Sequence, residues 1–108
     1  MSKIKIAEDF SKYPGPRLSK VGKNSGEELR ENVLLGKIQD AISKNEVLIV
    51  DLDGVFGYAA SFLDEAFGGL VFKNNIRIED LQKHMVIVSS ENPDYIDEIW
   101  EYILEKAE

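Results

Sequence analysis

Two short apolar runs stand out in the chain, because each contains branched residues and is bounded by polar positions. Residues 47–50 (Val-Leu-Ile-Val) and 85–88 (Met-Val-Ile-Val) contain no polar side chain. A strand covered on both faces, as at the centre of an α/β sheet, has this composition. Residues 3–7 instead alternate between polar and apolar positions, which predicts a strand with one buried face.

A long helix is predicted to begin at Ser25. The sequence Ser-Gly-Glu-Glu at 25–28 fits a capping box, in which the serine hydroxyl and the glutamate carboxylate satisfy each other's backbone N–H groups. Apolar residues then recur at helical spacing as far as Lys44. We expect the helix to end there, because Asn45 tolerates the left-handed conformation that closes a helix.

Three more helices are predicted in the second half of the chain. One starts near Ser61, with Ser61 or Ala60 as its cap, and its end is expected at Gly68-Gly69. A short helix covers 78–84. The last helix follows Asn92-Pro93, a cap residue followed by proline at the first helical position, and runs to about Lys106.

The residues between the first strand and the first long helix are rich in Pro, Gly, Ser and Lys. This composition predicts a long loop, within which Leu18–Val21 could form a short edge strand. With that strand included, the order of elements predicts a single α/β domain over residues 1–108. We expect a small mixed or mostly parallel four-stranded sheet packed with about four helices.

Composition and charge exclude several classes of function. The net charge is −7, so phosphate backbones would repel the chain and nucleic acid is not an expected partner. Without cysteine, and with one histidine (His84), thiolate chemistry and most zinc sites are excluded, and we expect no metal or cofactor. No run approaches the roughly 18 apolar residues that span a bilayer, and the N-terminus lacks an apolar signal core. We therefore expect no membrane association and a cytoplasmic location.

The string closest to an enzyme motif is VLIVDLDGV at 47–55. It resembles the first motif of the haloacid-dehalogenase-like phosphohydrolases. That resemblance would make Asp51 the nucleophile and Asp53 the general acid/base, both near Mg²⁺. The downstream lysine and acidic pair of that family have no counterpart here. The favoured alternative is that both aspartates finish a strand and that Asp53-Gly54 forms a turn.

Basic residues near the first long helix suggest a second candidate site. Arg17 and Arg30, together with the helix start at Ser25 and Gly26, could form an anion pocket. Such a pocket would suit a sensor of nucleotides or oxyanions. The alternative is a solvated loop with a structural Arg–Glu contact.

Two blocks of sequence resemble the bacterial STAS-like family of unknown function, which is related to the STAS domains of anti-sigma factor antagonists. The first is Arg17 with Ser-Gly-Glu-Glu-Leu-Arg at 25–30. The second is Ser-Phe-Leu-Asp-Glu-Ala-Phe-Gly at 61–68. The resemblance extends over about residues 3–105 and implies a STAS-like domain.

The resemblance also implies a regulatory module without an enzymatic activity. STAS antagonists dock on a protein partner, often a histidine-kinase-like ATPase or serine kinase, and a serine at the start of the second helix is their phosphorylation switch. Here Ala60 takes the place of that serine and only Ser61 matches, so we expect docking without the standard switch. The predicted docking surface comprises Gly57, Tyr58, Ala59, Ala60, Ser61 and Phe62. The oligomeric state remains open.

Overall fold

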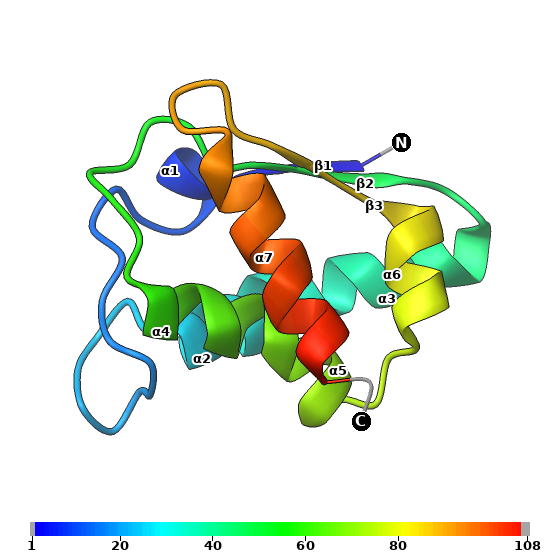
Figure 1. Ribbon diagram of the computed structural model, residues 1–108, viewed down its shortest axis with the longest axis horizontal. Helices are drawn as coiled ribbons and strands as arrows, with labels where there is room; N and C mark the ends of the chain where they lie inside the picture. Colours follow the sequence, from blue (N-terminus) through cyan, green and yellow to red (C-terminus); the bar gives the residue numbers. More distant parts are fainter. Residues whose placement is uncertain (1, 107–108) are drawn as a thin grey trace.

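A computed structural model describes residues 2–106 of the chain. Its described part contains a parallel sheet of three strands, in the order β1-β2-β3 (Figure 1). The strands are β1 (Ser2–Lys5), β2 (Leu48–Asp51) and β3 (Met85–Val88). The mostly parallel α/β architecture is therefore confirmed, but the predicted fourth strand is absent from this part of the chain.

Helices connect the strands and complete the fold. Between β1 and β2, after the short helix α1 (Ile6–Asp9), one continuous helix consists of α2 (Gly26–Leu29), η1 (Arg30–Leu34) and α3 (Leu35–Lys44). A second consists of α4 (Ala60–Leu63), η2 (Asp64–Gly68) and α5 (Gly69–Phe72). The remaining helices are α6 (Ile78–His84) and α7 (Asp94–Glu105). Among residues 2–106, no helix combines the length and the apolar character needed to cross a membrane.

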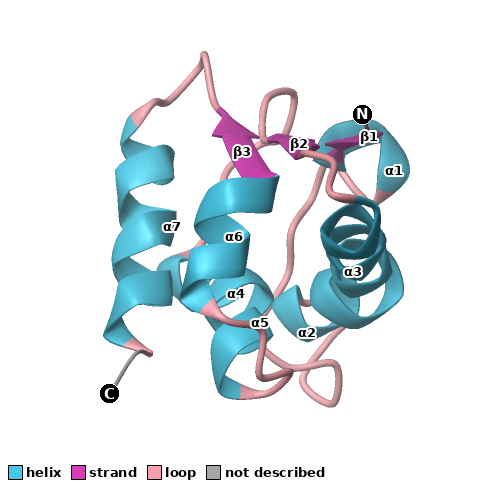
Figure 2. Ribbon diagram, turned by 90° about the vertical axis from the view of Figure 1, so that its right-hand side faces the viewer, coloured by secondary structure: helices cyan, strands magenta, loops and turns pink. Residues whose placement is uncertain are grey.

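The helices lie on one face of the sheet (Figures 1 and 2). Because the strand order advances steadily in one direction, right-handed crossovers place both connecting helices on the same side. Ile4, Val50 and Ile87 face these helices and are buried. On the opposite face Ile49 is only half-buried and Val86 is 49% exposed. The prediction of strands covered on both faces is therefore wrong for β2 and β3.

The ends of the first long helix follow the sequence signals closely. The Ser25 hydroxyl accepts a hydrogen bond from the backbone N–H of Glu28 at 3.0 Å, and Asn45 adopts the left-handed conformation, with φ of 55°. Only half of the predicted capping box forms. The Glu28 carboxylate accepts from the backbone N–H of Asn24, at 3.2 Å, instead of from Ser25.

The N-terminal strand and the loop after it differ from the prediction. The strand stops at Lys5 rather than at residue 7, because the Asp9 carboxylate accepts the Lys5 N–H at 2.8 Å and starts the short helix α1. The predicted edge strand at Leu18–Val21 is instead a turn, in which the Val21 N–H donates to the Leu18 carbonyl at 3.0 Å.

The boundaries of the later helices shift by a few residues. Ala59, not Ala60 or Ser61, is the N-terminal cap of α4. The helix does not end at Gly68-Gly69, since both glycines are helical and the chain continues as α5 to Phe72. The predicted helices at 78–84 and after Asn92 are confirmed, with Pro93 one position ahead of α7.

Candidate functional site

The two blocks that carry the family resemblance pack against each other. Gly26, at the start of the first long helix, faces Phe62 in the second. A Cβ atom at Gly26 would lie 2.5 Å from the Phe62 carbonyl oxygen and 3.2 Å from the Glu65 Cβ. Only glycine therefore permits the backbones of the two helices to approach this closely.

An ion pair between Arg30 and Glu65 is buried at this contact. The Arg30 Nη1 atom donates to the Glu65 backbone carbonyl at 2.8 Å and to its carboxylate. The two side chains are only 1% and 5% exposed. A Cβ at Gly69 would collide with Arg30 Nη1, so the missing side chain leaves space for the guanidinium. Within residues 2–106, Arg30 Nε has no hydrogen-bond partner.

Both helices depart from α-helical geometry at this ion pair. The π-helical segment η1 begins at Arg30, and η2 begins at Asp64, next to Glu65. A π-helical turn is rare and is found frequently at functional sites. The helix pair is therefore irregular at the point where its charged residues gather.

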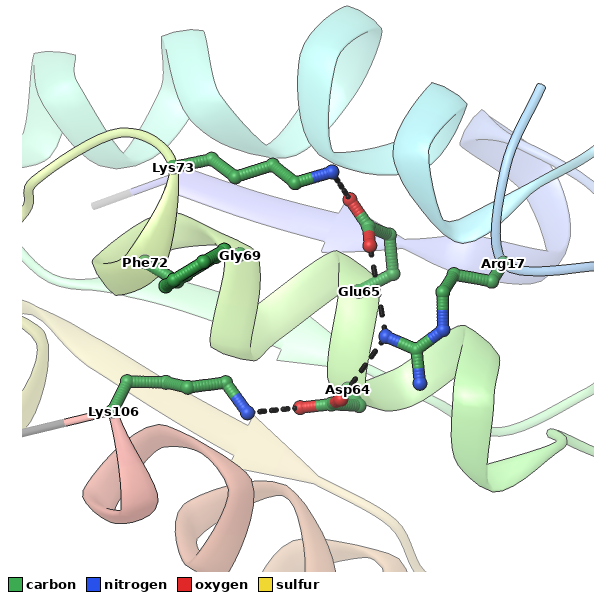
Figure 3. A pocket seen from close by; sticks show the side chains of 7 residues that line it. All are labelled: Arg17, Asp64, Glu65, Gly69, Phe72, Lys73 and Lys106. Carbon is green, nitrogen blue, oxygen red and sulfur yellow. Dashed lines mark hydrogen bonds and ion pairs between the residues drawn. The ribbon is translucent and has the colours of Figure 1, made fainter. Parts of the chain in front are cut away.

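A cavity of about 250 Å³ opens beside this ion pair. Figure 3 shows Arg17, Lys73 and Lys106 reaching toward Asp64 and Glu65 from three different segments. Arg17 contacts Asp64 at 3.0 Å and Glu65 at 3.6 Å. Lys73 contacts Glu65, and Lys106 contacts Asp64, each at 2.8 Å. Gly69 and Phe72 complete the wall.

The two carboxylates of this cluster are held in their charged form. Burial raises the pKa of Glu65, but hydrogen bonds from Lys73 and Arg30 outweigh it and the pKa is lowered. Burial likewise raises the pKa of Asp64, and hydrogen bonds from Lys106 and Arg17 lower it below its ordinary value. The cluster is therefore a network of full charges at neutral pH.

The structure brings together only part of the predicted anion pocket. Arg17 and Arg30 both reach Glu65, so they share a carboxylate, as the alternative of an Arg–Glu contact expected. Ser25 and Gly26 are buried, and the Ser25 hydroxyl is hydrogen-bonded to Ser19 Oγ at 2.9 Å as well as to Glu28. These two residues start a helix and are not accessible to an anion.

Sequence reasoning missed Lys73 and Lys106 as members of the cluster. Both are single lysines at the ends of helices, far from Arg17 along the chain, and their spacing carries no signal. The acidic pair Asp64-Glu65 was visible only as part of the family resemblance. The fold, not a motif, creates this grouping.

The aspartates of the enzyme-like string are already engaged with the protein. Asp51 accepts the Asp53 N–H at 2.9 Å and contacts Lys5 at 3.6 Å. Asp53 accepts the N–H groups of Ser90 and Glu91, at 3.1 and 3.0 Å. These bonds, the one from Glu91 first, lower the pKa of Asp53.

This geometry agrees with the interpretation that the two aspartates end a strand and build a turn. The Gly54 N–H donates to Glu91 Oε1 at 2.7 Å, so hydrogen bonds join the turn after β2 to the loop after β3. Across residues 2–106, no group of three or more histidine, cysteine or acidic side chains is placed to hold a metal ion.

Two residues of the predicted docking surface belong to the core. Phe62 is fully buried, and the buried Tyr58 donates its hydroxyl hydrogen to the Leu52 carbonyl at 2.7 Å. Burial accordingly raises the pKa of Tyr58. The prediction that Tyr58 and Phe62 lie on a surface is therefore wrong. Gly57, Ala59 and Ala60 are exposed, and Ser61 is half-buried.

An exposed aromatic pair lies next to these exposed residues. Phe56, which directly precedes Gly57, stacks on Tyr13 with ring centroids 5.0 Å apart and planes inclined by 7°. The two side chains are 78% and 64% exposed. The Phe56 N–H donates to the Lys12 carbonyl at 3.0 Å and so joins the two loops. The sequence shows both aromatic residues but not that they meet.

These observations describe a small α/β domain with a three-stranded parallel sheet, helices on one face, and a pair of helices joined by a buried ion pair. Residues 25–95 match the model of the STAS-like domain of unknown function (DUF4325), and the chain belongs to this family. The match includes both halves of the helix pair, so the family resemblance is confirmed over residues 25–95, a shorter range than the predicted 3–105, and Arg17 lies outside it. No curated protein and no solved structure matches the chain significantly.

Proposed function

We propose that this chain is a cytoplasmic regulatory module that acts by binding another protein and performs no chemistry of its own. The docking surface comprises Tyr13, Phe56, Gly57, Ala59 and Ala60, and it lies at the N-terminal end of the second long helix. The partner class is the one that the family resemblance implies, a histidine-kinase-like ATPase or a serine kinase.

The exposed Tyr13–Phe56 stack is the observation that carries this proposal. Most of the surface of both rings is exposed to solvent. Because the two rings stack on each other, their positions are already defined before a partner binds. Exposed aromatic side chains are enriched among the residues that dominate protein–protein binding energies, since they bury a large area at low cost in conformational entropy. The neighbouring glycine and alanines are small enough to let a partner's backbone approach.

The proposal includes no phosphorylation switch at the start of α4. Ala60 is exposed at the position that the resemblance assigns to the switch serine, and alanine has no group to phosphorylate. Ser61 is half-buried within the first turn of α4. Regulation of docking would then depend on the partner or on another part of this chain.

The state of the strand-end carboxylates supports a non-enzymatic role. A nucleophilic aspartate and a general acid need oxygen atoms that are free to meet a substrate or Mg²⁺. Asp51 and Asp53 instead accept hydrogen bonds from backbone N–H groups, and Asp51 also contacts Lys3 and Lys5. In the competing phosphohydrolase interpretation, Mg²⁺ and a substrate would have to compete with these contacts for the same oxygens.

Co-purification with a candidate partner tests the proposal. The histidine-kinase-like ATPases and serine kinases of the same genome are expressed one by one with the wild-type chain and with Phe56→Ser. We expect one of them to form a stable complex with the wild type. Loss of the exposed ring should weaken that complex by about tenfold or more, since a central aromatic residue at an interface contributes about 2 kcal/mol.

Val21→Ser is the matched control, because Val21 is 71% exposed and lies in the same loop as Tyr13. It should leave the complex unchanged. A complex that forms equally well with Phe56→Ser and with the wild type would show that docking uses another surface. Turnover of an aryl phosphate that disappears in Asp51→Asn would contradict the non-enzymatic role.

A further inference from the structure

We propose that the cavity bounded by Arg17, Lys73, Lys106 and Phe72 binds a small organic anion, a phosphate or carboxylate that carries an apolar group. This site uses none of the residues of the docking surface, so it can be tested independently of the proposed function.

The first argument is the local charge. The whole chain has a net charge of −7, yet three cations and two carboxylates line this cavity. One of these carboxylates, Glu65, also pairs with the buried Arg30, whose other acidic contact is the exposed Glu31 at 3.8 Å. Positive charge is therefore in excess at the cavity, which favours an anionic ligand.

The second argument is that the cations can turn toward a ligand. The side chains of Arg17 and Lys73 are 42% and 38% exposed. Arg17 contacts Asp64 and Glu65 through Nη1, and Lys73 contacts Glu65. Arg17 offers a planar fork of donors, which matches the oxygen pairs of phosphates and carboxylates. Lys73 and Lys106 would add point charges from opposite sides of the cavity (Figure 3).

The third argument concerns the size and the apolar wall. A cavity of about 250 Å³ lies just below the usual range for small-molecule sites, roughly 300–1,000 Å³, and would exclude a dinucleotide. Phe72 is 71% exposed at its rim, beside the cations. An uncovered phenyl ring in this position suits a ligand whose anionic group is attached to a ring or an aliphatic chain.

Nuclear magnetic resonance titrations of the ¹⁵N-labelled chain test this site with three probes, phenyl phosphate, benzoate and inorganic phosphate, at constant ionic strength. We expect saturable shifts of the backbone amides of Gly69, Phe72, Lys73 and Lys106 with at least one organic probe. Its affinity should exceed that of inorganic phosphate by about fivefold, because the apolar group adds contact with Phe72. The tighter of the two organic probes identifies the phosphate or the carboxylate as the preferred group.

Three variants decide the assignment. Lys73→Met should weaken binding by about tenfold, the effect of losing one charge-assisted hydrogen bond. Phe72→Ala alters an exposed side chain and should abolish the preference over inorganic phosphate without affecting folding. Lys44→Met, which removes a lysine paired with Asp40 on α3, should change nothing. Shifts that rise linearly with probe concentration, or that Lys44→Met reduces as much as Lys73→Met does, would overturn the proposal.

Discussion

Arg30 and Glu65 are separated by 35 positions in the chain, yet a single guanidinium nitrogen of Arg30 donates to both the backbone carbonyl and the carboxylate of Glu65. The contact joins the two sequence blocks that carry the family resemblance, both of which contribute residues to the matched range 25–95. It follows that these blocks are related through packing, since each supplies one half of a helix–helix contact. A family signature of this kind identifies a fold element before it identifies an activity.

Removal of Glu65 should be more damaging than removal of Arg30. In Glu65→Ala the buried guanidinium loses its carboxylate, and breaking a buried pair in this way costs about 3–5 kcal/mol. In Arg30→Met the carboxylate keeps Lys73 and Arg17, and the new side chain is apolar. We therefore expect Arg30→Met to lower the free energy of unfolding, measured by urea denaturation, clearly less than Glu65→Ala does. Arg77→Met, at an exposed pair with Glu79, should change little, and equal losses in the first two variants would contradict this account.

A methyl group should destabilise the fold at the two glycines of the helix contact and stabilise it at an exposed helical glycine. Gly26→Ala places a carbon against the Phe62 carbonyl, a backbone atom that cannot move aside, and should cost about 1–3 kcal/mol. Gly69→Ala should also destabilise the fold, because it displaces the buried Arg30. Gly36→Ala lies on an exposed helix position with open space around it and should stabilise by about 0.5–1 kcal/mol. Thermal melts compare the three variants, and an unaffected Gly26→Ala would argue against the close approach of the helices.

Stability should fall in acid because of the charged cluster. The pKa values of Asp64 and Glu65 are lower in the folded protein than their ordinary values of 3.8 and 4.5, so folding favours the charged forms. The resulting stabilisation is fully present above pH 4.5 and is lost as the pH falls through the lowered values. Urea denaturation between about pH 7 and pH 3 should show this decline. Asp64→Asn/Glu65→Gln should flatten the curve, and an identical decline in that variant would assign the acid sensitivity to other groups.

The hydrogen bonds between the turn after β2 and the loop after β3 should depend on Asp53. Its carboxylate accepts the N–H groups of Ser90 and Glu91, so Asp53→Ala should speed hydrogen exchange at these two amides. Exchange in β2 should change less, because those amides are bonded within the sheet. Asp80→Ala, in the first turn of α6, is the control variant. Mg²⁺ should produce no saturable shift of the Asp51–Gly54 amides, and a saturable one would revive the phosphohydrolase interpretation.

The local signals in the sequence predicted most of the elements. Capping at Ser25, the left-handed Asn45 and the apolar runs of β2 and β3 are determined by neighbouring residues, and the structure confirms them. The open face of the sheet could not be predicted in the same way. A run such as Met-Val-Ile-Val gives no information on strand order, and strand order decides whether the helices cover one face or two.

The candidate site was harder to predict because its residues meet only through the tertiary fold. Tyr58 and Phe62 follow an exposed loop in sequence but point into the core, whereas Phe56 stays exposed and meets Tyr13 from another loop. Lys73 and Lys106 reach the Asp64-Glu65 pair from segments that no spacing rule connects. The π-helical turns at Arg30 and Asp64 likewise have no signature in the sequence.

Hydrogen exchange on the complex with the proposed protein partner tests the central claim most directly. The account predicts that binding slows exchange at the amides of residues 12–13 and 56–61, which carry the stacked rings and the start of α4. The amides of α6, which lies on the other side of the molecule from α4 in Figure 1, should exchange at the same rate with and without the partner. Protection confined to the open face of the sheet, with residues 56–61 unchanged, would contradict it.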